Sequence, residues 1–170
     1  MQASNIPVAV ISDAGPLIHL DELGCLDLLS VFHEVLVPKE VWLEVRRHRP
    51  TALRTPGVPL EKVDLIPEPS PQLTVLMQNF PLDVGEEQAL RLMGKIFPAT
   101  LLTDDAAARI VARFLGFDVH GTIGVLILGL RMGLRSKKDT IAILKSIRLQ
   151  SSLFVTKKFL KKVIGQLRKS

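Results

Sequence analysis

The stretch PVAVISDAG, residues 7–15, carries a short apolar run into a carboxylate, Asp13. An apolar run of this length is typical of a buried strand. Because burying an unpartnered carboxylate is unfavourable, an aspartate at the end of such a strand needs a reason. A second stretch, PATLLTDDAAAR at residues 98–109, repeats the pattern of apolar strand, hydroxyl residue and aspartate, here Asp104. The repetition indicates that a site is built between the two strand ends.

The composition is that of one globular domain. Apolar residues make up 47% of the 170 residues, which excludes a disordered chain and predicts a single domain over residues 1–170. The one cysteine, Cys25, permits no disulfide framework within the chain, which favours a cytoplasmic location. The first residues lack a signal-peptide pattern, and the strongest apolar run, residues 121–130, is too short to span a bilayer. We therefore expect no membrane association.

Short apolar runs alternate with longer stretches of helical periodicity. Strands are predicted at residues 8–11, 34–37, 62–66, 100–103, 118–120 and 153–155. Helices are predicted at residues 16–30, 38–47, 70–79, 84–97, 105–115, 122–133, 137–149 and 156–168. This alternation is typical of an α/β fold with a mainly parallel sheet covered on both faces. One long loop is expected at residues 46–59, where proline and arginine are frequent.

Ligands of such folds bind outside the carboxyl ends of the strands, where Asp13 and Asp104 would both lie. A third acid, Glu86, shares a helical face with Leu90, Met93 and Phe97 and should therefore face the sheet. Its neighbour Glu87 lies about 100° further round the helix.

Each acid also has an ordinary structural explanation. Asp13 and either Asp104 or Asp105 are suited to cap helices, and Asp83 with Glu86 has the spacing of a capping box. On the helix surfaces, the i,i+4 spacing predicts ion pairs of Asp105 with Arg109 and of Glu87 with Arg91. Capping does not exclude a second role for any of these acids.

Asp13, Glu86 and Asp104 are expected to converge, with Asp105 close by. Two carboxylates about 4 Å apart repel by about 4 kcal/mol at an effective dielectric constant of about 20. A divalent cation would offset this repulsion, and all-oxygen ligands suit Mg²⁺ or Mn²⁺. Such a site activates water for phosphodiester cleavage.

Basic residues point to a nucleic-acid partner for this acidic site. The formal net charge is +5 and the isoelectric point is about 9.6, which favours an anionic partner. The arginines expected to contact nucleic acid are Arg46, Arg47, Arg49 and Arg109. The four histidines lack zinc-site spacing, and phosphate-loop, dinucleotide and nucleophile-elbow motifs are missing from the sequence.

Five stretches occur in an order that resembles PIN-domain proteins, and more closely the prokaryotic branch related to VapC toxins. They are SDAGPLIHLDELGCLDLL, EVLVPKEVWLEV, LDVGEEQALRL, LLTDDAAARIVARFLGFDVHGTIGVL and FVTKKFLKKVI, and the resemblance covers residues 8–163. It implies a three-layer α/β/α sandwich and a Mg²⁺- or Mn²⁺-dependent endoribonuclease that cleaves single-stranded RNA. It also implies a homodimer and an antitoxin protein as partner, as in a toxin–antitoxin pair.

The family's acids fall on Asp13, Glu86, Asp104 and, for the last, either Asp105 or Asp118. Many relatives carry a hydroxyl residue directly after the first aspartate, where this chain has Ala14; Ser12 or Thr103 would have to supply that hydroxyl.

Two other functions stay open. One is a nucleic-acid- or protein-binding module on a PIN-like scaffold, in which the acids only cap helices. The other is an aspartyl phosphotransfer protein, which also places aspartates at strand ends but requires a lysine near one of them.

Overall fold

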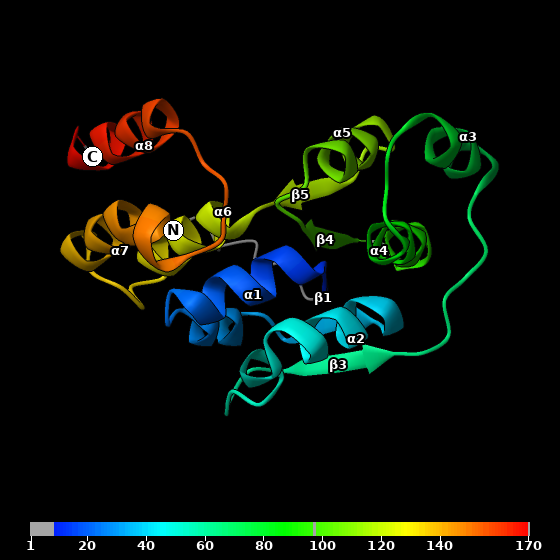
Figure 1. Cartoon of the computed structure of the whole chain (residues 1–170), viewed down its shortest axis with the longest axis horizontal. Coiled ribbons are helices and arrows are strands. Elements are labelled where there is room, and N and C mark those ends of the chain that lie inside the picture. The colour runs from blue at the N-terminus through cyan, green and yellow to red at the C-terminus, as the bar shows by residue number, and fades with distance from the viewer. Residues whose placement is uncertain (1–8, 97, 170) are drawn as a thin grey trace.

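The computed structural model describes residues 9–96 and 98–169 and contains a five-stranded sheet in the order β3-β2-β1-β4-β5 (Figure 1). All four strand pairs are parallel. The strands are β1 (Ala9–Ser12), β2 (Glu34–Pro38), β3 (Leu60–Val63), β4 (Ala99–Leu102) and β5 (Asp118–His120). The α-helices are α1 (Ala14–Glu22), α2 (Lys39–His48), α3 (Pro71–Asn79), α4 (Val84–Lys95), α5 (Ala106–Phe114), α6 (Thr122–Arg131), α7 (Lys137–Gln150) and α8 (Lys157–Lys169), with 3-10 turns η1 (Leu26–Val31) and η2 (Pro50–Leu53).

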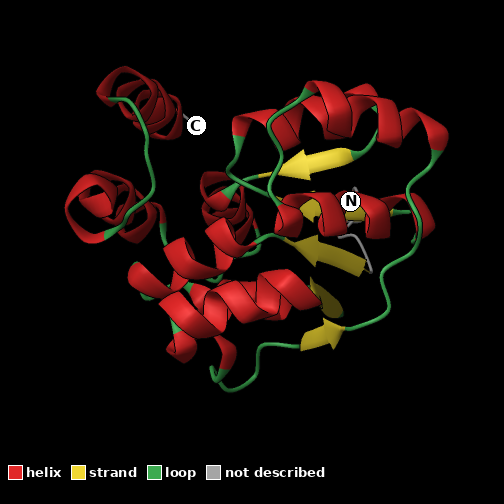
Figure 2. Cartoon of the chain, turned by 45° about the vertical axis from the view of Figure 1, so that its right-hand side comes forward, coloured by secondary structure: helices red, strands yellow, loops and turns green. Residues whose placement is uncertain are grey.

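Helices cover both faces of this sheet, which confirms the predicted three-layer α/β/α fold (Figure 2). Alternate residues of β1 serve the two faces, as the pleat requires. Val10 packs in a core with α1, α2, η1 and α6, which α7 and α8 extend on the far side of α6. Ile11 packs in a second core with α3, α4 and α5.

The chain reverses direction across the sheet between β1 and β4. After β1 it builds β2 and β3 on one side, and it then crosses to the other side for β4 and β5. Ser12 and Leu102 are register partners, and Asp13 N–H donates to the Leu102 carbonyl at 2.8 Å. The carboxyl ends of β1 and β4 therefore lie side by side at the switch point, where open parallel sheets bind ligands.

The predicted elements differ from the structure in four main places. The strand predicted at residues 62–66 is β3 at Leu60–Val63. The helix predicted at residues 16–30 ends at Glu22, because Gly24 adopts a φ of 63° and turns the chain before η1. Residues 153–155 form no strand. The loop predicted at residues 46–59 starts later, since α2 runs to His48 and η2 follows it. Val8 and Phe97, which belonged to a predicted strand and helix, lie outside the described residues.

The third arginine of the predicted loop is held by an ion pair. Arg49 Nε contacts Asp21 Oδ2 at 2.6 Å, and the Thr51 hydroxyl donates to the same oxygen at 2.7 Å. These bonds tie the start of η2 to α1.

One helix contact leaves no room for a side chain. A methyl group at Gly129 of α6 would lie 2.7 Å from a δ-carbon of Leu28, whose own exposed fraction is 1%. A methyl group at Gly165 of α8 would meet nothing within 4 Å. We expect Gly129→Ala to lower the free energy of unfolding by about 1–2 kcal/mol, because overpacking exceeds the gain in helix propensity.

Gly165→Ala is the matched control and should raise the free energy of unfolding by up to about 1 kcal/mol. Urea denaturation of both variants measures the difference. An equal gain in both would show that the core around Leu28 yields to an extra methyl group.

Candidate active site

A cavity of about 430 Å³ opens at the switch point between β1 and β4. Six acidic side chains and His19 line it. The acids come from α2, from α4 and its N-cap, and from the ends of β1 and β4. The acids are Asp13, Glu44, Asp83, Glu86, Asp104 and Asp105. The structure therefore brings together all four acids predicted for the site and adds two more.

Asp13 follows β1 directly and is 7% exposed. One carboxylate oxygen accepts from Ala14 N–H at 2.7 Å, which caps α1, and the other accepts from the Thr103 hydroxyl at 3.0 Å. Burial nevertheless raises the pKa of Asp13 to about 7. Of the two hydroxyl residues considered for its support, Thr103 serves it, whereas the Ser12 hydroxyl donates to the backbone carbonyl of Asp13.

Glu86 carries out both of the roles that the sequence left open. Asp83 N–H donates to Glu86 Oε2, and Glu86 N–H donates to Asp83 Oδ1, each at 2.8 Å, which completes the predicted capping box. Glu86 is also 8% exposed and lines the cavity. Burial and then the charges of Asp83, Asp13 and Asp105 raise its pKa to about 8. Glu87 instead pairs with Arg91 at 3.7 Å, as predicted.

Asp104 is held from three directions. His19 Nδ1 lies 2.8 Å from Asp104 Oδ2, and both the N–H and the hydroxyl of Thr122 donate to the same carboxylate. Burial opposes ionisation here, but these hydrogen bonds prevail and lower the pKa of Asp104 below its ordinary value. A methyl group at Gly121 would lie 2.5 Å from Asp104 Oδ1, so the chain passes too close for any other residue.

The fourth acid at the cavity is Asp105 rather than Asp118. Asp105 Oδ1 caps α5 by accepting from Ala108 N–H at 2.8 Å. Asp118 begins β5 opposite Thr100 and is exposed at the amino end of the strand, away from the switch point. The predicted pair of Asp105 with Arg109 is wrong: the Arg109 guanidinium donates to the Thr103 carbonyl at 3.1 Å instead.

The sequence analysis gave no role at the site to His19, Glu44 or Gly121. It predicted Asp83 as part of a capping box but not as a residue that lines the cavity. His19 follows Gly15 by one helical turn, and both lie against Asp104, so the i,i+4 spacing after a strand-end aspartate was the available signal. Gly121 carried none, because its role depends on how closely β4 and the start of α6 approach.

The four predicted nucleic-acid contacts lie in different surroundings. Arg46 and Arg47 are exposed on the last turn of α2, which also carries Glu44. Arg49 is engaged with Asp21. Arg109 lines a second cavity that adjoins the acidic one.

The donor set fits a hard divalent cation. The six Asp and Glu side chains that line the cavity offer carboxylate oxygens, and Mg²⁺ and Mn²⁺ prefer oxygen donors. Burial raises the pKa values of Asp13 and Glu86, which means that their charged forms are unfavourable in this cavity. A bound cation would stabilise those charged forms. Within residues 9–96 and 98–169, no three His, Cys, Asp or Glu side chains already lie close enough to hold a metal ion.

Comparison with known proteins agrees with this geometry. A family model described as a PIN domain (DUF3368) matches residues 9–169, and the chain belongs to that family. PIN domains are generally nucleases. No curated protein matches the chain, so its place in the VapC-related branch stays a prediction. Of the helices that the structure describes, none has the length and apolar character needed to cross a membrane.

The raised carboxyl pKa values make the stability of the metal-free protein depend on pH. A carboxyl with a raised pKa stabilises the fold below its ordinary pKa, and this contribution is lost as the pH rises through the folded-state value. The window runs from 3.8 to about 7 for Asp13 and from 4.5 to about 8 for Glu86. We expect the melting temperature to fall between about pH 4 and pH 8 as both acids ionise.

Glu86→Gln removes one of these two groups and keeps the capping box. The quantity of interest is the melting temperature of the variant minus that of the parent at the same pH. This difference should be more positive at pH 8 than at pH 5 by at least about 3 °C, which is roughly 1 kcal/mol for a domain of this size. Glu87→Gln is the control and should show no such pH-dependent difference. Thermal melts in the presence of a chelator measure it, and an identical offset at both pH values would place Glu86 in an ordinary solvated environment.

Proposed function

We propose that this PIN-domain protein is a Mg²⁺- or Mn²⁺-dependent endoribonuclease that cleaves single-stranded RNA. The observation that carries the proposal is the convergence of Asp13, Glu86, Asp104 and Asp105 on one cavity at the switch point. On the resemblance to VapC-related proteins, we further propose that it acts in the cytoplasm as the toxin of a toxin–antitoxin pair. An antitoxin protein and a second copy of the chain are its expected partners.

Asp13, Glu86, Asp104 and Asp105 would hold the cation, which when bound supplies an activated water and stabilises the charge that develops on the cleaved phosphate. The rest of the chain positions these acids. Thr103 orients Asp13, while His19 and Thr122 orient Asp104 and keep it ionised. Asp83 fixes the rotamer of Glu86 through the capping box.

Basic side chains around the acidic cavity would hold the RNA backbone. Arg46 and Arg47 follow Glu44 on the last turn of α2, and Arg109 lines the second cavity, which adjoins the acidic one. Contacts of this kind attract any nucleic acid and weaken with salt. Arg49 contributes less to this surface, since Asp21 already neutralises its charge.

One specific observation favours the non-catalytic binding module. Asp13, Glu86 and Asp105 each accept a hydrogen bond from the first turn of a helix or from its cap, so each has a structural role without metal. The phosphotransfer alternative is weaker, because none of the described residues that line the acidic cavity is a lysine.

Metal binding distinguishes the nuclease from the binding module. We expect Mn²⁺ at about 100 times its dissociation constant to stabilise the parent by about 2.7 kcal/mol, a rise in melting temperature of about 5–10 °C. Asp104→Asn should abolish this increment because it removes a charged ligand. It should also lower the metal-free melting temperature, since Asp104 is stabilised by His19 and Thr122.

Asp118→Asn is the control, since Asp118 lies at the opposite end of a neighbouring strand. It should keep the full response to Mn²⁺. A response in Asp104→Asn as large as in the parent would show that Asp104 is not a ligand.

The adjacent residues Glu86 and Glu87 give the sharpest test of catalysis. With Mn²⁺ and a single-stranded oligoribonucleotide, Glu86→Gln should reduce the cleavage rate by at least about 100-fold, the scale of lost charge stabilisation at a reacting centre. Glu87→Gln should cost less than about 3-fold, because it removes only a weak ion pair. An oligodeoxynucleotide of the same sequence tests the preference for RNA.

Circular dichroism of both variants checks that a loss of cleavage is not a loss of folding. If the parent cleaves and both variants match it, Glu86 is only a helix cap. If the parent cleaves nothing, the binding module is the better description.

A further inference from the structure

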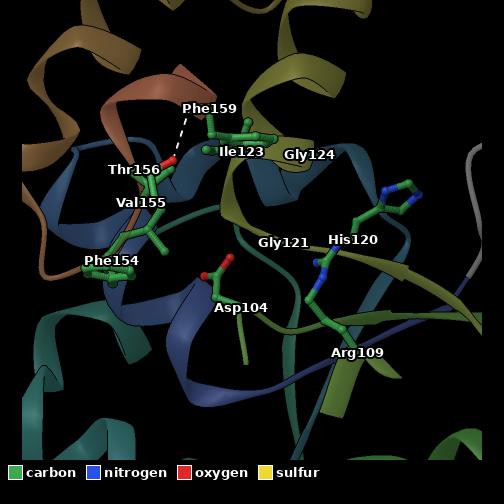
Figure 3. Close-up of a pocket in the computed structure, with 11 residues that line it drawn as sticks. Asp104, Arg109, His120, Gly121, Ile123, Gly124, Phe154, Val155, Thr156 and Phe159 are labelled. Atoms are coloured by element: carbon green, nitrogen blue, oxygen red, sulfur yellow. Dashed lines mark hydrogen bonds between the residues drawn. The ribbon is translucent and has the colours of Figure 1, made fainter. Parts of the chain in front are cut away.

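A second cavity of about 560 Å³ adjoins the acidic one (Figure 3). The two cavities share Asp104, Leu153 and Phe154 in their walls. The volume lies within the range of about 300–1,000 Å³ that is usual for small-molecule sites. A group bound in the second cavity would therefore lie directly beside whatever occupies the acidic one.

The walls of the second cavity are of two kinds. Ile123, Val155 and Phe159 form an apolar side, and Arg109 with Asp104 forms a charged side (Figure 3). Arg109 is half-buried and donates to the Thr103 carbonyl, and none of the described ion pairs involves it. An apolar wall next to a guanidinium that makes none of the described ion pairs, although the Asp104 charge acts on it, suits a ligand with one apolar part and one anionic part.

Phe154 stands at the junction of the two cavities and is 91% exposed. A phenyl ring so exposed gains nothing from burial within this chain. Phe154 belongs to the segment that connects α7 to α8, and the position of this segment leaves the ring exposed.

Hydrogen bonds tie the start of that segment to α1, and a local hydrogen bond marks its end at the start of α8. The Glu22 carboxylate accepts from Ser152 N–H at 2.7 Å and from the Ser151 hydroxyl at 2.9 Å. Burial opposes ionisation of Glu22, but these serine bonds lower its pKa, so the clamp is charged at neutral pH. On the other side, the Thr156 hydroxyl accepts from Phe159 N–H at 3.2 Å (Figure 3). The ring is thus presented on an ordered backbone, which reduces the entropy lost when a ligand binds it.

We propose that the second cavity binds the nucleotide next to the cleaved phosphate, with its base stacked on Phe154 and its phosphate held by Arg109. This inference rests on the proposed function, because it assigns the acidic cavity to the cleaved bond. Stacking on an aromatic ring accepts any base and is worth most for unstacked, single-stranded nucleic acid. The guanidinium suits a phosphate because it donates in a planar fork.

The test uses a single-stranded hexaribonucleotide with 2-aminopurine placed at each position in turn, since stacking on an aromatic ring quenches its fluorescence. Binding is measured with Mn²⁺ in the Glu86→Gln background, where cleavage is slow. We expect quenching at one position. Phe154→Ala should remove that quenching and weaken binding about 10-fold, whereas Phe154→Tyr should retain both.

Phe114→Ala is the matched control. Phe114 is 78% exposed at the end of α5 and is not among the residues that line either cavity. It should leave the quenching and the affinity unchanged. An equal loss in both alanine variants would overturn the subsite, because the effect would then be one of general surface hydrophobicity.

Cleavage by the parent gives a second, independent measurement. An abasic nucleotide at the quenched position should slow cleavage by the parent about 10-fold and should slow Phe154→Ala no further, because the two changes remove one interaction. If the abasic nucleotide slows cleavage by Phe154→Ala as much as it slows cleavage by the parent, the two changes act independently and the subsite is wrong.

The two proposals fail in different ways. If the parent cleaves no RNA, the endoribonuclease proposal fails, while the fluorescence still reports whether a base stacks on Phe154. If the parent cleaves but Phe154→Ala keeps the quenching, the subsite is wrong. The exposed ring would then be better explained as a contact for a protein partner.

Discussion

The parallel pairing of β1 with β4 is the constraint on which the rest of the structure depends. These strands are distant in sequence, and their register places Ser12 opposite Leu102. Asp13 and Asp104 consequently emerge at the same edge, one from each side of the point where the chain reverses direction. The helices that follow the strands start at this edge, so their capping residues gather there as well. The acidic cavity is thus a direct result of strand order.

Backbone N–H groups at helix starts supply hydrogen bonds to most of the acids that gather at the cavity. Asp13, Asp83, Glu86 and Asp105 each accept from a backbone N–H at or near a helix start, where the helix dipole favours negative charge. Burial works against ionisation and raises the pKa values of Asp13 and Glu86. These raised pKa values would couple the proposed binding of a cation to the release of protons from Asp13 and Glu86.

The fold class and the four acids were predictable because both depend on local patterns. Apolar strands, strand-end aspartates and the i,i+4 and i,i+7 spacing of Glu86 are visible in the chain itself. Contacts between distant segments were not predictable. The bond of His19 to Asp104 and the close approach of Gly121 depend on how α1 and α6 pack beside β4. Residues 153–155 looked like a strand because they are apolar, but Glu22 engages Ser151 and Ser152 just before them and the segment joins no strand.

The bonds from Glu22 to Ser151 and Ser152 lie between two groups of residues with different proposed roles. All the acids at the cavity lie before residue 106, whereas Phe154 and Phe159 come from the last part of the chain. α7 and α8 pack in the same core as α1, and the Glu22 carboxylate adds a polar tie to the segment between them. The hydrogen bonds described for Asp13, Glu86, Asp104 and Asp105 come from residues up to Thr122. A change around Phe154 would therefore alter what lies beside these acids without breaking the bonds that hold them. A chimera joined just after Ser152 would exchange Phe154 and α8 while keeping α7 and the bonds of Glu22 to the two serines.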